Sequence, residues 1–187
     1  MEYVFYVFLF ISLYFQIFLL VSFFEKKVDG SSDTDTKEYD LLTTTIIVPC
    51  YNEESTVVRT INSLLALDYP KDKLIIMIID DGSTDTTWQV IQQFVNDPRI
   101  RLYQKQNEGS KFAALNYALD HVNTELVGVL DADSWVEPQA LKNYMEFFAD
   151  PEVMATIPSM VIADPDSPMR RAQKAEYDIG LFARKSF

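Results

Sequence analysis

The sequence has few of the residues that build sulfur and imidazole sites, with one cysteine, Cys50, and one histidine, His121, among 187 residues. A single cysteine excludes an intramolecular disulfide, and without a cluster of Cys and His the common zinc sites are excluded as well. No G-x-G-x-x-G follows a strand-like segment, which disfavours a dinucleotide-dependent oxidoreductase. Internal repeats and low-complexity tracts are also absent from the sequence.

Basic residues are scarce too. The chain carries 16 lysines and arginines against 28 acidic residues, a formal charge of −12 at pH 7. Sequence-independent nucleic-acid binding needs clustered positive charge to neutralise phosphates, so no nucleic-acid partner is expected. A hydrophobic content of 48% in a chain of this length suits one globular domain with an appendage.

The appendage is predicted at the N-terminus, where residues 3–24 contain no charged side chain. About 20 such residues suffice to cross a bilayer, so residues 1–27 are predicted to form one transmembrane helix with a basic flank. Because Lys26 and Lys27 follow the apolar run, the positive-inside rule predicts a protein of the cell membrane with its following domain in the cytoplasm. Residues 28–42 are rich in Ser, Thr, Asp and Gly and are predicted to form a linker.

The remainder, residues 43–187, alternates between two kinds of segment. Short apolar or β-branched runs typical of strands lie at 43–49, 73–80, 100–104 and 125–131. Helical patterns lie at about 55–67, 84–96, 110–122 and 138–148, and further along the chain a strand is predicted at 153–161 and a terminal helix at 169–187. This alternation predicts an α/β fold, a mostly parallel, Rossmann-like sheet with helices on both faces.

Three predicted strands end in unusual polar sequences: "VPCYNEES" at 48–55, "IDDGSTD" at 79–85 and "LDADSW" at 130–135. Ligands of open α/β sheets bind outside the carboxyl ends of the strands, so the three segments are expected to cluster around one site. Each segment also has a purely structural explanation, because Asp, Gly, Ser and Thr form turns and helix caps.

Asp131 and Asp133 are the strongest site candidates. In extended backbone, side chains two residues apart point the same way, so both carboxylates are predicted to converge. Oxygen ligands without His or Cys suit a hard cation such as Mg²⁺ or Mn²⁺, which completes its shell with water and substrate phosphates. The alternative is a solvated turn. Lys111, at the start of a predicted helix where the dipole disfavours a cation, indicates an anionic ligand unless it is a solvated surface lysine.

Three segments in this order, "TIIVPCYNEESTVVRTINSLLALDYPKDKLIIMIIDDGSTDTT", "NEGSKFAALNYAL" and "LDADSWVEP", resemble the N-terminal, nucleotide-binding half of a family 2 glycosyltransferase with a GT-A fold. The resemblance covers about residues 43–187. It implies an inverting transferase that takes a nucleotide-sugar donor, usually a UDP-sugar, together with Mg²⁺ or Mn²⁺.

The resemblance assigns donor-binding roles to seven residues: Pro49, Tyr51, Glu53, Asp81, Lys111, Asp131 and Asp133. The first three would border the nucleoside, the next would contact the base, and the lysine would lie near the donor. Asp131 would support the ribose or diphosphate, and Asp133, beside it, would bind the metal. A cation bridging both carboxylates to the donor diphosphate explains why two acidic side chains lie together.

Within the family, the N-terminal apolar run, "LDYP" and "KFAALNYAL" are most similar to membrane-embedded synthases of poly-N-acetylglucosamine, cellulose, chitin and hyaluronan. The similarity implies UDP-GlcNAc or UDP-glucose as donor and a polysaccharide or lipid-linked acceptor. A polyprenyl-phosphate sugar transferase shares "DDGSTD" and is the first alternative; a binding module without turnover is the second. The general base of the family is expected beyond Phe187, so the chain is interpreted as an incomplete or degenerate transferase.

Overall fold

The fold is that of a computed structural model, which describes residues 2–25, 40–158, 160–163 and 166–186. Its internal contacts divide the chain into two units, Glu38–Thr156 and Met1–Lys37 with Ile157–Phe187. The first unit carries a β-sheet, and the second carries the N-terminal and C-terminal helices. Most of the predicted linker, together with Lys26 and Lys27, lies outside the described residues.

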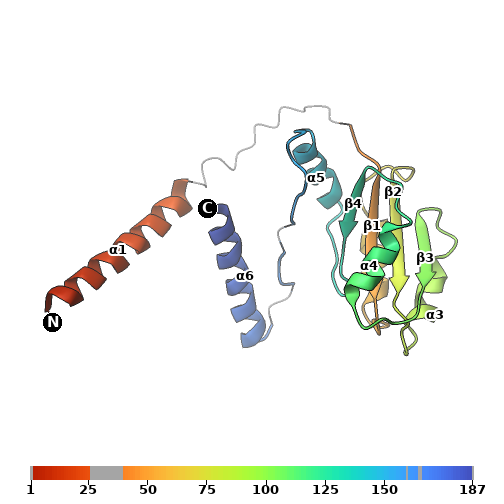
Figure 1. Cartoon of the computed structure of the whole chain (residues 1–187), viewed down its shortest axis with the longest axis horizontal. Coiled ribbons are helices and arrows are strands. Elements are labelled where there is room, and N and C mark those ends of the chain that lie inside the picture. The colour runs from red at the N-terminus through yellow and green to blue at the C-terminus, as the bar shows by residue number, and fades with distance from the viewer. Residues whose placement is uncertain (1, 26–39, 159, 164–165, 187) are drawn as a thin grey trace. The chain divides into compact units, whose positions relative to one another are not determined.

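Four parallel strands form the sheet of the first unit, in the order β3-β2-β1-β4 (Figure 1). They are β1 (Thr44–Cys50), β2 (Leu74–Asp80), β3 (Ile100–Gln104) and β4 (Leu126–Val129). Each matches a predicted strand, although β4 ends at Val129 instead of residue 131. The predicted parallel α/β sheet is therefore confirmed.

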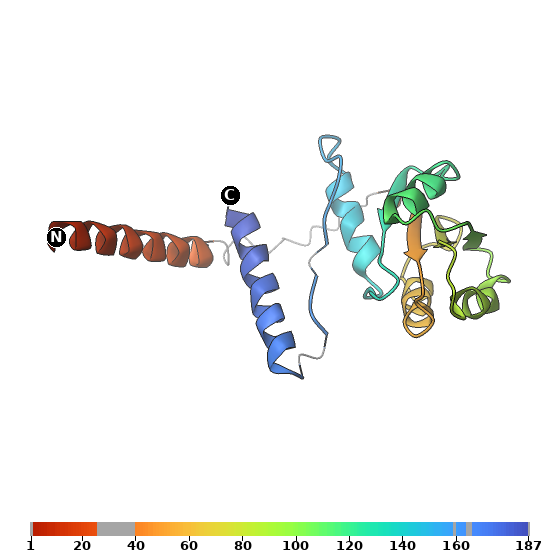
Figure 2. The ribbon, with the colours of Figure 1, turned by 60° about the horizontal axis from the view of Figure 1, so that its bottom comes forward.

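Helices cover both faces of this sheet (Figure 2). One face is covered by α2 (Val57–Leu65), α3 (Thr87–Ile91) and α5 (Ala140–Phe148), and the other by α4 (Lys111–Leu119). A short 3₁₀ helix, η1 (Gln92–Phe94), continues α3. Parallel strands need a crossover connection, so α2, α3 and α4 cover the sheet as the links between successive strands, and α5 follows the last strand.

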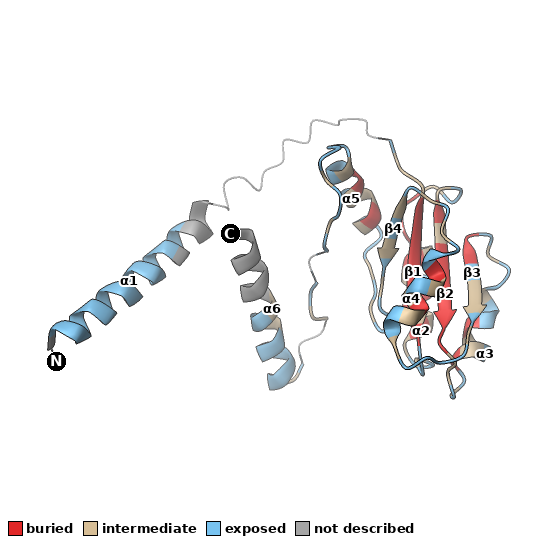
Figure 3. Cartoon of the chain, viewed as in Figure 1, coloured by how far each residue is buried: buried red, intermediate tan, exposed pale blue. Residues whose placement is uncertain are grey.

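The central strands β1 and β2 are buried along most of their length (Figure 3). Their successive side chains supply two separate hydrophobic cores. In β2, Ile76 and Ile78 pack in the core on the α2 face, whereas Met77 and Ile79 pack in the core on the α4 face. All four are at most 2% exposed. Burying one such side chain stabilises the fold by about 1.5–3 kcal/mol, so a strand apolar on both faces is stable only between two helical layers.

The predicted strand at 153–161 is wrong for the described residues of that segment, which adopt no regular secondary structure. Met154 and Ile157 are 88% and 78% exposed. A strand needs a neighbour that pairs with its backbone groups, and the apolar composition of a segment does not report whether a neighbour is present.

The N-terminal segment forms one helix, α1 (Glu2–Glu25), with exposed side chains at residues 3–18, 20 and 21. Within the part of the chain that the structure describes, no helix has both the length and the apolar character needed to cross a membrane. The predicted transmembrane span is therefore not supported. In the same unit, the predicted terminal helix is observed as α6 (Pro168–Ser186).

Candidate functional site

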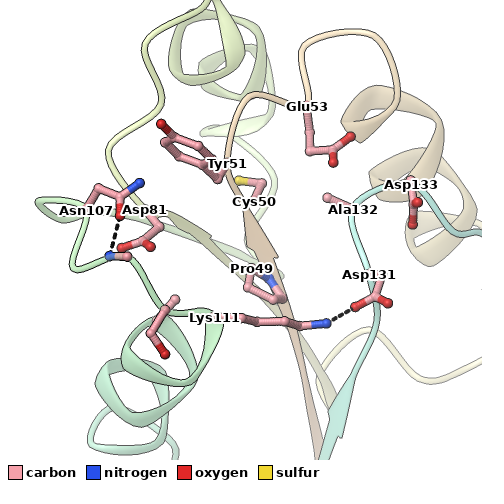
Figure 4. A pocket seen from close by; sticks show the side chains of 13 residues that line it. Pro49, Cys50, Tyr51, Glu53, Asp81, Asn107, Lys111, Asp131, Ala132 and Asp133 are labelled. Atoms are coloured by element: carbon pink, nitrogen blue, oxygen red, sulfur yellow. Dashed lines mark hydrogen bonds and ion pairs between the residues drawn. The ribbon is translucent and has the colours of Figure 1, made fainter.

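A cavity of about 490 Å³ lies at the carboxyl ends of β1, β2 and β4 (Figure 4). The structure brings all seven predicted donor-binding residues into its lining. The complete lining consists of Pro49, Cys50, Tyr51, Glu53, Asp81, Asn107, Gly109, Ser110, Lys111, Ala114, Asp131, Ala132 and Asp133. The expectation that the three polar strand ends meet at one place is confirmed.

The polar groups of this cavity lie on two sides. Figure 4 shows Asp81 and Asn107 on one side and Asp131 and Asp133 on the other, with Pro49 between them at the end of β1. The first side comes from the segments that follow β2 and β3, and the second from the segment that follows β4. The cavity can therefore hold an elongated ligand with chemically different ends.

The loop after β1 is held by Asn52, which has a φ of +56°. Asparagine tolerates this left-handed conformation better than most residues. Its Oδ1 accepts a hydrogen bond from the backbone N–H of Thr84 at 2.8 Å, and its own backbone N–H donates to Ser83 Oγ at 2.9 Å. The loop that carries Tyr51 and Glu53 is therefore fixed to the loop after β2.

The loops after β2 and β3 also approach each other closely at Gly82. Its φ is +69°, and a Cβ atom there would lie 2.7 Å from the backbone nitrogen of Asn107. Gly109 has a similar φ of +72°, but a Cβ atom there would meet nothing within 4 Å. Of these two glycines, Gly82 alone combines a left-handed backbone with close packing.

This pair of glycines gives a matched test. Gly109→Ala is expected to lower the free energy of unfolding by about 1–2 kcal/mol, the cost of a left-handed alanine. Gly82→Ala is expected to cost ~1–3 kcal/mol more, because the added methyl group displaces the backbone at Asn107. Urea unfolding of both full-length variants measures the difference, and equal losses would contradict the close approach of the two loops.

Asp81 directly follows β2 and is 6% exposed. Lys105 Nζ lies 2.7 Å from Asp81 Oδ1, and the hydrogen bond to Asp81 raises the pKa of Lys105. A buried carboxylate without a partner is strongly destabilising, so the ion pair with the lysine makes a buried carboxylate possible on this side of the cavity.

Asp131 and Asp133 lie in a turn, because β4 ends at Val129 and the N–H of Ser134 donates to the carbonyl of Asp131 at 3.0 Å. The prediction that extended backbone makes the two carboxylates converge is therefore wrong, although both line the cavity. Ala132 between them is 4% exposed and packs in the core, whereas both aspartates are exposed.

Thr60 of α2 fixes this turn. The side chain is 1% exposed, and its Oγ1 lies 2.8 Å from the carbonyl oxygen of Ala132 and 2.6 Å from that of Ser134. Further along, the N–H of Val136 donates to Ser63 Oγ on the same helix at 3.2 Å. Helix α2 therefore determines where the two aspartates stand.

Lys111, the first residue of α4, forms an ion pair with Asp131 Oδ1 across the cavity (Figure 4). The two side chains are 51% and 56% exposed. An ion pair of this exposure contributes only about 0–1 kcal/mol, so either partner can be exchanged. A phosphate can compete for the lysine, and a cation can compete for the aspartate.

Cys50 in the floor of the cavity is not a nucleophile. Burial and then the charge of Asp80 raise the pKa of its thiol to about 12. The thiol donates to the carbonyl of Ile79 at 3.4 Å. Because the thiolate is the reactive form, Cys50 remains an inert packing residue at neutral pH.

The cavity offers oxygen ligands for a hard cation. Among the described residues, no group of three or more His, Cys, Asp or Glu side chains is placed to hold a metal ion alone. Mg²⁺, however, is commonly bound by one or two carboxylates and completed by water and substrate phosphates. Asp131 and Asp133 therefore fit a divalent cation that is held jointly with a phosphate-bearing ligand.

Sequence reasoning missed several residues of the site. Asn107, Gly109 and Ser110 line the cavity from the segment after β3, and Thr60 and Lys105 support it from behind. Ligands of open α/β sheets bind at strand ends, and this rule applies to β3 as well. The segment "QNEGS" at 106–110, which follows β3, therefore qualifies as a fourth site segment. Thr60 and Lys105 carried no signal, because their roles depend on contacts distant in sequence.

The parallel sheet, covered by helices on both faces and carrying a cavity at the carboxyl ends of its strands, places the chain in the class of open α/β proteins. The chain belongs to the family "Glycosyl transferase family 2", whose model matches residues 45–186.

Two curated relatives illustrate this membership. Over 172 residues the chain is 29% identical to the poly-beta-1,6-N-acetyl-D-glucosamine synthase of Staphylococcus epidermidis, covering 90% of this chain and 41% of the relative. Over 103 residues it is 32% identical to the poly(ribitol-phosphate) beta-N-acetylglucosaminyltransferase TarS of Staphylococcus aureus, covering 54% of this chain and 18% of the relative. The chain thus spans less than half the length of these relatives.

Two solved structures share the fold. The complex of S. aureus TarS 1-349 with UDP-GlcNAc superposes with a TM-score of 0.54 at 30% identity, over 57% of this chain and 31% of that shortened TarS chain. The mannosyltransferase PcManGT from Pyrobaculum calidifontis, in complex with GDP-Man and Mn²⁺, gives a TM-score of 0.60 at 29% identity, over 76% of this chain and 43% of that one. The fold is therefore GT-A-like.

Proposed function

We propose that this chain binds a UDP-sugar, UDP-GlcNAc or UDP-glucose, and serves the inverting transfer of its sugar to a polysaccharide or lipid-linked acceptor. The observation that carries the proposal is the cavity in which Asp81 lies on one side and Asp131 and Asp133 lie on the other. A nucleotide-sugar has this polarity, with a hydrogen-bonding base at one end and a diphosphate at the other.

The donor is proposed to lie with its base beside Asp81 and its diphosphate beside the two aspartates. Pro49, Tyr51 and Glu53 border the nucleoside along the first part of the cavity. Tyr51 is 47% exposed, so its ring is accessible to a base. This orientation of the donor follows from charge. The exposed carboxylates of Asp131 and Asp133 suit a metal–diphosphate, and the buried carboxylate of Asp81 suits a neutral base.

The diphosphate end is proposed to bind Mg²⁺ or Mn²⁺ through Asp133 and Asp131. Such a cation neutralises the charge that develops on the leaving nucleoside diphosphate. Lys111 would then leave Asp131 and pair with a phosphate oxygen. The position of Lys111 at the N-terminus of α4 favours this change, because the backbone N–H groups there also attract an anion. The relative solved with GDP-Man and Mn²⁺ supports the use of a divalent metal.

Titration calorimetry of the full chain in detergent, with Mn²⁺ present, tests the choice of donor. UDP-GlcNAc and UDP-glucose are expected to bind more tightly than GDP-mannose, and chelation of the metal is expected to weaken all three. The TarS complex supports the UDP assignment, whereas the PcManGT complex supplies the GDP-sugar alternative. Tighter binding of GDP-mannose would contradict the donor assignment, and no binding of any donor would contradict the function.

Transfer is tested separately with the same chain and a labelled donor. Label in a precipitated polymer supports a polysaccharide synthase, and label extracted into organic solvent supports a polyprenyl-phosphate sugar transferase. Donor binding with no transferred label supports the binding-only alternative.

We also propose that α1 attaches the protein to a lipid bilayer at the cell membrane, with the cavity on the cytoplasmic side. The support is the exposure of consecutive residues 3–11, which are apolar or aromatic and therefore leave no polar side of the helix in that stretch. The full chain is expected to float with liposomes after a carbonate wash, whereas a variant with lysine in place of Phe8 and Leu13 is expected to remain in the dense fraction. Equal recovery of both proteins in the dense fraction would contradict attachment through α1.

A further inference from the structure

Lys105 lies directly behind the cavity without lining it, and its ammonium group is saturated with hydrogen bonds. Its Nζ donates to Asp81 Oδ1 at 2.7 Å, to the carbonyl of Gln106 at 2.8 Å and pairs with Glu108 Oε1 at 2.9 Å. The side chains of Lys105 and Asp81 are each 9% exposed. An ammonium group has three N–H donors, so each donor has an acceptor and the lysine has one defined position.

The backbone around Lys105 is equally constrained. Its N–H donates to the carbonyl of Asp80 at 3.0 Å, which continues the pairing of β2 with β3 by one residue. Gly82 then approaches the backbone of Asn107 so closely that a Cβ atom does not fit. The lysine therefore holds Asp81 against a rigid pair of loops, and the orientation of the carboxylate is fixed.

The charges of the cavity show why this lysine matters. Its lining contains four carboxylates, those of Glu53, Asp81, Asp131 and Asp133, and one lysine, Lys111. An anionic ligand is repelled by such a lining unless the carboxylates have cations beside them. Lys105 supplies the cation for Asp81 from outside the lining, which leaves the space beside that carboxylate free for a neutral group.

We propose that Lys105 is the positioning residue for base recognition, an inference that rests on the proposed function. It occupies Oδ1 of Asp81, while Oδ2 has no hydrogen bond to any described residue. The oriented Oδ2 accepts a hydrogen bond from a ring N–H of the base. Uracil carries one such N–H, at N3 between two carbonyl groups, and methylation of N3 removes it without changing the diphosphate.

The experiment compares UDP with N3-methyl-UDP, in the presence of Mn²⁺, by titration calorimetry on full-length wild type and Lys105→Met. The wild type is expected to prefer UDP by about tenfold or more, the scale for a hydrogen bond to a charged group. Lys105→Met is expected to bind UDP more weakly and to bring the ratio of the two affinities close to one. A change in this ratio separates positioning from a general loss of stability, which lowers both affinities equally.

Lys142→Met is the matched control, because Lys142 also pairs with an aspartate, Asp68, at 3.3 Å, but its side chain is 45% exposed and does not line the cavity. It is expected to retain the wild-type ratio. If Lys105→Met folds poorly, two further variants decide the question: Asp81→Asn, and the double variant that combines Asp81→Asn with Lys105→Met. The double variant leaves no unpaired buried carboxylate. Both variants are expected to bind UDP and N3-methyl-UDP with a ratio of affinities close to one.

The outcomes separate this inference from the proposed function. If the wild type binds UDP and Lys105→Met keeps the wild-type ratio of the two affinities, the inference about Lys105 is overturned but the proposed function is not. A further loss of UDP affinity when Lys105→Met is added to Asp81→Asn also overturns it, because the lysine would then act independently of Asp81. Wild type that fails to bind UDP overturns the proposed function and the inference with it.

Discussion

Asp133→Asn is expected to weaken Mn²⁺-dependent binding of UDP by about 10- to 100-fold, which corresponds to ~1–3 kcal/mol. The amide keeps the shape of the side chain but removes one of the two carboxylates available to a cation held jointly with the diphosphate. The fold should be unaffected, because Asp133 is exposed and its side chain receives one hydrogen bond, from Ser134 Oγ at 3.3 Å. Titration calorimetry with and without Mn²⁺ measures the effect.

Asp120→Asn is the control for this experiment. Asp120 is exposed at the C-terminal end of α4 and does not line the cavity, so its variant should bind UDP like the wild type. If Asp133→Asn also binds UDP with wild-type affinity in Mn²⁺, the aspartate pair is a solvated turn and the metal assignment fails.

Thr60→Val is expected to affect both stability and the site. Valine matches threonine in shape but cannot donate to the carbonyl oxygens of Ala132 and Ser134, which lie 2.8 Å and 2.6 Å from Thr60 Oγ1. Loss of a hydrogen bond to buried carbonyl groups costs about 1–3 kcal/mol of the free energy of unfolding. Because the same carbonyls define the turn that carries Asp131 and Asp133, the Mn²⁺-dependent affinity for UDP should fall by about tenfold as well.

Thr45→Val separates these two effects. Thr45 is 1% exposed near the start of β1, where its hydroxyl accepts a hydrogen bond from Thr124 Oγ1 at 2.8 Å. This variant should lose stability in urea unfolding without losing affinity for UDP. Parallel losses of affinity in both variants would mean that Thr60 acts only through global stability.

The arrangement of the fold was predictable from local patterns. The apolar run "LIIMIID" and the shorter runs around it indicate buried strands, because alternate side chains of β2 enter two different cores. The segment at 153–161 has a similar composition but forms no strand in its described residues, because strand formation also requires a neighbour with free backbone groups. The apolar run at the N-terminus, by contrast, predicts a helix, and the structure has the helix α1 there.

The sequence by itself supplied the seven candidate residues, through the family resemblance, and it also predicted the edge of the sheet at which they meet. Polar side chains at the carboxyl ends of parallel strands face the same crevice. Only the tertiary structure decided how those residues are held. Thr60 supports the aspartate turn from 72 residues away in the chain, and Lys105 compensates Asp81 from 24 residues away. A hydroxyl or an ammonium group acts wherever folding places it within about 3 Å of an acceptor, and no local pattern encodes such a distance.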